Sequence, residues 1–184
     1  MTVAAVVLAA GAGSRFHGQT HKLLARLGDR TLVAHAVGAA VASGLPTFVV
    51  TGAVELDGRI DPQAILVYNP RWSEGQVTSL RAGIAAAAAA GHDAVVVGLG
   101  DQPLVGPHAW SALAACPAPM AVATYGGRLG NPVRLGAEVW GHLPTIGDQG
   151  TESVVWERED LVVRVPCQGD PADVDTVEDL GRWS

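Results

Sequence analysis

The sequence is short of cysteine, of positive charge and of long apolar runs, and each shortage excludes a class of protein. Its 184 residues include two cysteines, Cys116 and Cys167, which lie far apart and lack the spacing of metal ligands. We therefore expect reduced thiols in a cytoplasmic protein. Lys and Arg total 12 against 18 Asp and Glu, a net charge of −6, which argues against a nucleic-acid partner.

No segment has the length and apolarity of a membrane span. The apolar N-terminus lacks the basic residues of a signal peptide and continues into a glycine-rich segment. The stretch 31–45 is interrupted by His35, Ser43 and two glycines, and it is too short to cross a bilayer. We expect no membrane partner.

The composition that remains is that of a folded α/β protein. Hydrophobic residues make up 48% of the chain and charged residues 16%, which excludes a disordered chain. The length predicts one domain, residues 1–184, with a large buried core. Short β-branched runs alternate with alanine-rich stretches of helical length, and several runs are apolar throughout, as in strands covered on both faces. This alternation predicts an α/β domain with a mostly parallel sheet.

The strands are expected at 3–8, 47–51, 65–68, 94–99, 120–124 and 161–165, and the helices at 31–43, 76–90, 107–115, 151–158 and 176–182. Thr176 and Asp179 have the spacing of a capping box at the start of the last helix, and Pro107 suits a first helical position. Ligands of such sheets bind beyond the carboxyl ends of the strands, so the loops that follow the strands are the places to look for a site.

The first of these loops lies in residues 8–24, LAAGAGSRFHGQTHKLL, and is rich in glycine. It has Gln19 where a P-loop has its lysine, and its third glycine, Gly18, comes two residues too late for a dinucleotide fingerprint. The backbone N–H groups of such a loop, with Arg15 and the chain's only lysine, Lys22, are suited to binding phosphate oxygens. A tight structural turn with two solvated cations is the alternative.

LAAGAGSRF…HKLL resembles the opening motif of nucleotidyltransferases that use NTPs, and the chain is identified as a member of the MobA-like NTP transferase family, most similar to molybdenum cofactor cytidylyltransferases. Further family motifs follow in order: NPRWSEGQVTSLRAG (69–83), GDQPLV (100–105), GGRLGNPVRLG (126–136), GDQGT (147–151) and DVDT (173–176). The resemblance implies a three-layer α/β fold with a mostly parallel sheet of Rossmann-like topology, of the nucleotide-diphospho-sugar transferase type. The chain departs from the family at Phe16, where Met is usual, at Asn131, where His is common, and by two extra residues before Lys22.

The resemblance also implies a reaction. A nucleoside monophosphate would pass from an NTP to a phosphate monoester, with release of pyrophosphate and with Mg²⁺ as cofactor. CTP is favoured because Ala10 and Gly100 complete the LAAG and GDQP motifs that accompany CTP in the family. A small phosphorylated acceptor such as molybdopterin is implied, as is contact with a molybdoenzyme or its chaperone.

Roles for individual residues follow from the same resemblance. Arg15, Lys22 and Asp101 are implied to be catalytic, and Asp101 and Asp175 to bind Mg²⁺. Nucleotide binding is implied for Leu8, Ala9, Ala10, Gly11, Ala12, Gly13, Ser14, Asn69, Gly75, Ser79 and Gly100. From the residues alone, Asp101 could be a turn residue and Asp175 a carboxylate at a helix start, and Asp173 competes with Asp175 as the second ligand. Trp72 is expected to anchor a loop by packing, with contact to a pterin as the alternative.

Other functions stay open on the sequence. A nucleotide-binding accessory protein could deliver a cofactor without turnover, although the presence of Asp101 and Lys22 favours an enzyme. A guanylyltransferase could act on a different phosphorylated acceptor. An oxidoreductase would need a dinucleotide bound at residues 11–18.

Overall fold

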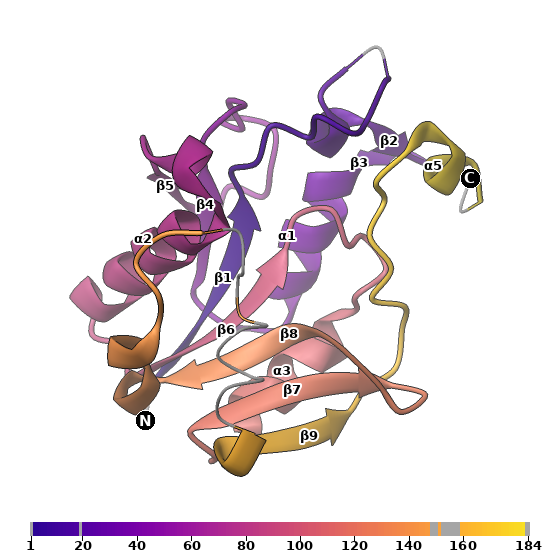
Figure 1. Ribbon diagram of the computed structural model, residues 1–184. Helices are drawn as coiled ribbons and strands as arrows, with labels where there is room; N and C mark the ends of the chain where they lie inside the picture. The colour runs from indigo at the N-terminus through magenta and orange to yellow at the C-terminus, as the bar shows by residue number, and fades with distance from the viewer. Residues whose placement is uncertain (1, 19, 148–150, 152–158, 183–184) are drawn as a thin grey trace.

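In the computed structural model, the described residues, 2–18, 20–147, 151 and 159–182, contain one seven-stranded sheet and a short two-stranded ribbon (Figure 1). The sheet order is β5-β4-β1-β6-β8-β7-β9. Its strands are β1 (Val3–Ala9), β4 (Thr47–Thr51), β5 (Ile65–Tyr68), β6 (Ala94–Leu99), β7 (Met120–Tyr125), β8 (Arg128–Gly136) and β9 (Val162–Pro166), and the ribbon is β2 (Arg26–Leu27) with β3 (Arg30–Thr31). All strands of the sheet are parallel except β8, which is antiparallel to its neighbours β6 and β7.

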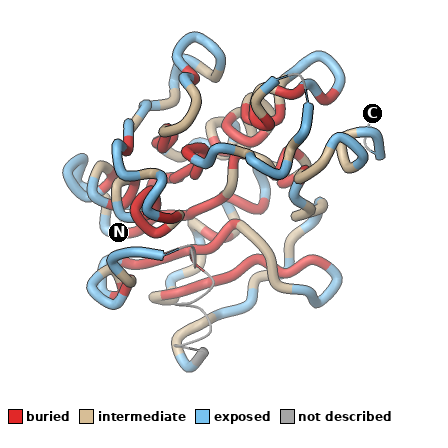
Figure 2. The backbone as a smooth tube through the Cα atoms, turned by 45° about the horizontal axis from the view of Figure 1, so that its top comes forward, coloured by how far each residue is buried: buried red, intermediate tan, exposed pale blue. Residues whose placement is uncertain are grey.

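Helices cover both faces of the central strands and give three layers (Figure 1). On one face α1 (Leu32–Ala42) and α3 (Pro107–Ala115) pack against the sheet, and on the other face α2 (Gln76–Ala89) and the 3₁₀ segment η3 (Ala137–His142) do so. The side chains of β1 alternate between these two cores, as the two-residue period of a strand requires. Figure 2 shows that the buried residues are concentrated in the middle of the molecule. Further helical segments among the described residues are η1 (Lys22–Leu24), η2 (Trp72–Glu74), η4 (Glu159–Leu161) and α5 (Val177–Arg182).

The predicted α/β fold with a mostly parallel sheet is confirmed. The strand and helix ends within the described residues lie one residue or less from those expected. Thr31, for example, is not the first residue of α1 but its cap, since its Oγ1 accepts a hydrogen bond from Ala34 N at 3.3 Å. The expected helix 151–158 falls outside the described residues except for Thr151. No helix among the residues described is long and apolar enough to cross a membrane.

Two features of the sheet do not follow from the apolar runs. Strand β8 is not predicted from the sequence, because its nine residues have no continuous apolar run and contain Gly130, Asn131 and Pro132 at an irregularity in the pairing with β7. β5 is an apolar run, yet it lies at the edge of the sheet. Ile65 is 50% exposed and Tyr68 67% exposed, because β5 is an edge strand and α2 covers it only in part.

Gly83 allows α2 to lie close to β1 and β4. A Cβ at this position would lie 2.4 Å from Val6 Cγ1 and 3.0 Å from Val50 Cγ2. We expect Gly83→Ala to lower the free energy of unfolding by about 1–3 kcal/mol, because overpacking outweighs the helix-propensity gain of alanine. Urea denaturation measures the change. Gly181→Ala in α5 is the control, since a Cβ there meets open space. If Gly83→Ala were tolerated as well as Gly181→Ala, close packing of α2 would not limit stability.

Candidate active site

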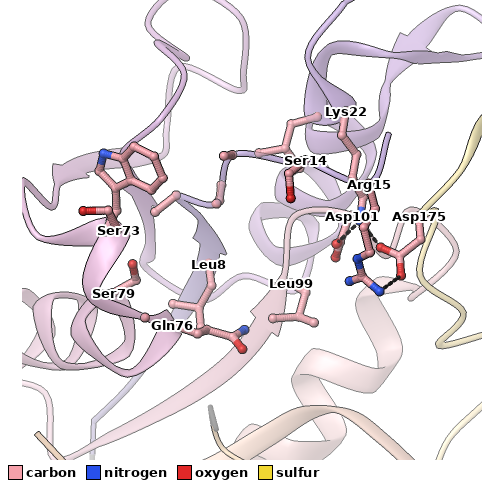
Figure 3. Close-up of a pocket in the computed structure, with 18 residues that line it drawn as sticks. Leu8, Ser14, Arg15, Lys22, Ser73, Gln76, Ser79, Leu99, Asp101 and Asp175 are labelled. Carbon is pink, nitrogen blue, oxygen red and sulfur yellow. Dashed lines mark hydrogen bonds and ion pairs between the residues drawn. The ribbon is translucent and has the colours of Figure 1, made fainter. Parts of the chain in front are cut away.

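A cavity of about 510 Å³ lies at the carboxyl ends of β1 and β6, the sheet edge where a ligand was expected (Figure 3). Its walls come from the loop after β1, from η1, from the turn between η2 and α2, from the loop after β6 and from the segment before α5. Most of the residues predicted for the site line it: Leu8, Ala9, Ala10, Gly11, Ala12, Gly13, Ser14, Arg15, Lys22, Gly75, Ser79, Asp101 and Asp175. Four further residues line the cavity and have no role predicted from the sequence: Leu23, Ser73, Gln76 and Leu99.

Two predicted residues, Asn69 and Gly100, do not line the cavity. Asn69 is buried and donates from Nδ2 to Thr78 Oγ1 at 2.9 Å and to Ser79 Oγ at 3.0 Å, so it fixes the turn that leads into α2. The N–H of Gly100 donates a hydrogen bond to Leu8 O at 2.9 Å, which joins the end of β6 to β1. Both therefore contact lining residues rather than the cavity itself.

The cavity has a charged end and an uncharged end, as Figure 3 shows. Arg15, Lys22, Asp101 and Asp175 gather at one end. Ser73, Gln76 and Ser79 lie at the other end, and Leu8 and Leu99 lie between the two ends. Trp72 and Gly75, next to Ser73 and Gln76 in the chain, also line the cavity. An elongated ligand with a charged part and an uncharged planar part matches this division.

Lys22 is the centre of the charged end. Its Nζ lies 2.7 Å from Asp101 Oδ2 and 2.5 Å from Asp175 Oδ1, and its side chain is only 8% exposed. Burial by itself would lower the pKa of Lys22, but the charges and hydrogen bonds of Asp101 and Asp175 together outweigh burial, so the pKa is raised above its ordinary 10.5. Lys22 is therefore a positively charged ammonium at neutral pH.

Arg15 completes the charged cluster from the solvent side. Its side chain is 80% exposed, and its guanidinium lies 2.9 Å from Asp175 Oδ2. Each oxygen of Asp175 thus has its own cation, Lys22 or Arg15. Because Arg15 is exposed, the pair with Asp175 is weakly held, and Arg15 is free to turn toward an anion.

Glycine is required where the loop meets Lys22. Gly13 has a φ of +62°, a left-handed conformation that glycine adopts without strain. A Cβ on Gly13 would lie 2.8 Å from Lys22 Cβ, so the lysine stem packs directly on the loop backbone. Among the glycines recognised in the sequence, Gly13 therefore allows the close approach between the loop and Lys22.

His21 joins the loop to η1. Its Nδ1 accepts a hydrogen bond from Leu23 N at 3.3 Å, so the proton lies on Nε2, which donates to Gly11 O at 3.1 Å. Burial is the main cause that lowers the pKa of His21 from its ordinary 6.5, and the charge of Lys22 lowers it further. His21 was not singled out from the sequence, where its place next to Lys22 was the available signal.

We expect His21 to make the protein less stable in mild acid. The pKa is lower in the folded state, so the unfolded chain takes up the proton first, and stability falls as the pH drops below about 6.5. The contribution to the slope is at most ~1.4 kcal/mol per pH unit, reduced by the partial exposure of the ring. His21→Gln should remove this part of the pH dependence of unfolding between pH 7 and 5, and His108→Gln, on an exposed position of α3, should not. Equal slopes for His21→Gln and the wild type would contradict the assignment.

The segment before α5 is fastened to the loop after β6, and this brings Asp175 to Asp101. Val174 is fully buried, and its N–H donates to Asp101 O at 3.1 Å. Gln102 is also buried and donates from Nε2 to Pro171 O at 2.7 Å and to Asp173 Oδ1 at 2.8 Å. Gln102 is a positioning residue that the sequence analysis quoted in GDQP without giving it a role.

The capping box predicted at Thr176 is present. Asp179 N donates to Thr176 Oγ1 at 3.1 Å, and Thr176 N donates to Asp179 Oδ2 at 3.0 Å. Asp175 N also donates to Asp179 Oδ2, at 3.2 Å. The backbone of Asp175 is therefore fixed from both sides.

The carboxylates fit a divalent cation. Asp101 Oδ1 is buried and has no hydrogen-bond partner among the described residues, which is costly unless something pairs with it. Mg²⁺ takes one or two carboxylates and completes its octahedral shell with water and phosphate oxygens. Asp101 and Asp175 could supply such a pair. No group of three or more His, Cys, Asp or Glu within the described ranges could form an all-protein metal cage.

Asp173, the competitor of Asp175, occupies a different place. It accepts its hydrogen bond from Gln102, and it is not among the residues that line the cavity. Loss of hydration around the carboxylate, followed by the negative charge of Asp101, raises the pKa of Asp173. Asp175, in contrast, lines the cavity and contacts both cations.

At the uncharged end, Trp72 both packs and lines the cavity. A Cβ on Gly52 would lie 2.6 Å from Trp72 Cγ, so glycine at 52 makes room for the indole. Trp72 also contacts the core on the α2 face of the sheet. Gly75, with a φ of +114°, precedes α2 in a conformation that favours glycine. The packing expected for Trp72 is present, and it leaves part of the residue facing the cavity.

Comparisons with known proteins agree with this fold. The family model of the MobA-like NTP transferase domain matches residues 5–161. No curated protein sequence matches the chain. The structure is similar to the homologue of Mycobacterium tuberculosis Rv0371c from Mycobacterium sp. strain JC1, with a TM-score of 0.83 and 29% identity over 98% of this chain and 93% of that one.

Two other solved structures share the fold at lower identity. A nucleotidyl transferase from Methanothermobacter thermautotrophicus has a TM-score of 0.82 and 24% identity over 98% of this chain and 95% of that one. Rv0371c from M. tuberculosis in complex with manganese has a TM-score of 0.77 and 24% identity over 100% of this chain and 98% of that one. With the family model spanning most of the chain, the protein belongs to the MobA-like NTP transferase family and is a nucleotidyltransferase of that family.

Proposed function

We propose that the protein, as one nucleotidyltransferase domain over residues 1–184, transfers CMP from CTP to a small phosphate monoester such as molybdopterin and releases pyrophosphate, with Mg²⁺ as cofactor. One observation carries the proposal. In a single cavity, a glycine-rich loop and two cations meet two carboxylates from distant parts of the chain, Asp101 and Asp175.

Each part of the cavity has a task in such a reaction. The backbone N–H groups of residues 11–14, with Arg15, would hold the β- and γ-phosphates. Lys22 would neutralise the charge that grows on the α-phosphate as the acceptor oxygen attacks and pyrophosphate leaves. Asp101 and Asp175 would hold Mg²⁺, which supplies Lewis-acid polarisation of the phosphate oxygens when bound. The transfer therefore depends on positioning and on charge neutralisation rather than on a general base.

The uncharged end supports a nucleoside as the remaining part of the donor. Ser73, Gln76 and Ser79 offer hydrogen-bonding groups at this end of the cavity, which Trp72 also lines. Ala10 is buried, and its carbonyl accepts a hydrogen bond from Ala53 N at 2.9 Å. The backbone at Ala10 is therefore held in place. A methyl group held there favours the smaller pyrimidine ring, in agreement with the choice of CTP.

The proposed metal is supported by the chemistry of Asp101 and Asp175 and by the manganese complex of the structurally similar Rv0371c. Molybdopterin as the acceptor, and a molybdoenzyme or its chaperone as the recipient of the product, rest on the family resemblance. A cytoplasmic location rests on the two cysteines, which are not joined to each other.

Pyrophosphate release tests the proposed function. The wild-type protein should release pyrophosphate from CTP faster than from GTP, ATP or UTP, only with Mg²⁺ or Mn²⁺ and only with a phosphate-monoester acceptor. Preference for GTP would show a guanylyltransferase. Nucleotide binding without release for any acceptor, molybdopterin included, would show an accessory protein instead. Tighter binding of NAD than of any NTP would favour an oxidoreductase.

A further inference from the structure

The ammonium of Lys22 occupies the space between the two carboxylates that are proposed to hold the metal. Its Nζ is within hydrogen-bond distance of both Asp101 and Asp175, at 2.7 Å and 2.5 Å. The lysine side chain is 8% exposed, so this position is enclosed by protein. Lys22 and a divalent cation would therefore compete for the same two carboxylates.

We propose that Lys22 is a built-in competitor for the metal, and that the triphosphate of the nucleotide relieves the competition by drawing the ammonium away. Metal and nucleotide would then bind cooperatively, and metal alone would bind weakly. The inference rests on the proposed function, because it takes the polyphosphate as the group that attracts Lys22.

The charge balance of the cluster favours this coupling. Arg15 and Lys22 already neutralise Asp101 and Asp175, so these two carboxylates together offer an entering dication no net negative charge. Once Lys22 turns to a phosphate, the carboxylates regain their charge and attract the metal. The network is also incomplete with Lys22 in place, since Asp101 Oδ1 has no partner among the described residues.

The side chains are suited to such an exchange. Lysine carries a compact charge on a flexible four-carbon stem, so its ammonium can move while the Cβ stays packed against Gly13. Arg15 is largely exposed and can leave Asp175 at the same time. The loop amides of residues 11–14, where the phosphates are proposed to bind, line the same cavity as Lys22.

Mn²⁺ binding without nucleotide is the first test, measured by the electron paramagnetic resonance signal of free Mn²⁺. Lys22→Met removes the ammonium and keeps a stem of similar length, and it should lower the Kd for Mn²⁺ at least about fivefold, the lower end of typical couplings between sites. Arg71→Met removes one positive charge from an exposed pair with Glu74 and should leave the Kd unchanged. An unchanged or higher Kd in Lys22→Met would overturn the proposal.

The coupling with nucleotide is the second part of this test. In the wild type, a non-hydrolysable CTP analogue should tighten Mn²⁺ binding, and in Lys22→Met the tightening should be smaller, because no ammonium has to leave. A tightening of equal size in both proteins would contradict the proposal.

A measurement on the wild type covers the case in which Lys22→Met does not fold. Lys22 is the only lysine, so a protein labelled with ¹³C-lysine gives one Cε signal from this site. The signal should move when the CTP analogue and Mg²⁺ are added together. A Cε signal that stays in place when both are bound would overturn the proposal. None of these measurements needs turnover, so an absence of pyrophosphate release would overturn the proposed function separately.

Discussion

Replacing Asp101 with asparagine is expected to lower the kcat of nucleotidyl transfer by at least about a thousandfold, which corresponds to ~4 kcal/mol of transition-state stabilisation. Asn keeps an oxygen that can accept from Lys22 Nζ, so the shape of the cluster is preserved. The asparagine lacks the negative charge. It also lacks the buried carboxylate oxygen, Oδ1, which has no hydrogen-bond partner among the described residues. Steady-state pyrophosphate release with CTP and Mg²⁺ measures the loss.

The same variant should remain folded, with a change in the free energy of unfolding of about 1 kcal/mol or less. Asp57→Asn is the matched control, because Asp57 is exposed and does not line the cavity. It should retain wild-type activity. Asp101→Asn with near-wild-type kcat would exclude a metal-binding role for Asp101, whatever its effect on stability.

Lys22→Met is expected to lower kcat by about a hundredfold to a thousandfold, the usual loss when one donor to a developing negative charge is removed. The KM for CTP should rise far less, because the loop amides and Arg15 still hold the β- and γ-phosphates. Lys22→Arg should not restore the rate, since a planar guanidinium does not fit the enclosed position of a side chain that is 8% exposed.

The split between kcat and KM distinguishes the catalytic role from simple binding. An unchanged kcat with a large increase in KM would mean that Lys22 holds the ground-state nucleotide only. Arg71→Met serves as the control for loss of charge, because Arg71 lies outside the cavity and pairs with Glu74.

The parts of the structure that the sequence predicted well are those with local signals. Apolar runs marked β1 and β6, and Pro107 marked the start of α3, because the pattern and the fixed φ of proline act within a few residues. The glycine-rich loop was recognised for the same reason. The anion binding proposed for it depends on backbone groups that lie next to one another in sequence.

The pairing of Asp101 with Asp175 was implied by the family resemblance and not by any local pattern, because it depends on contacts between distant segments. Asp175 lies 74 residues after Asp101, and its position depends on Gln102 holding Asp173 and on Val174 bonding to the carbonyl of Asp101. Such contacts join segments that are far apart in the sequence. Neither composition nor hydrophobic periodicity therefore predicts them.

The place of the triphosphate and the metal can be observed directly by anomalous diffraction from crystals grown with Mn²⁺ and a non-hydrolysable CTP analogue. We predict a manganese peak at Asp101 and Asp175, the polyphosphate on the amides of residues 11–14, and the base beside Trp72. Manganese bound away from both carboxylates, or the nucleotide bound outside this cavity, would contradict the proposed chemistry.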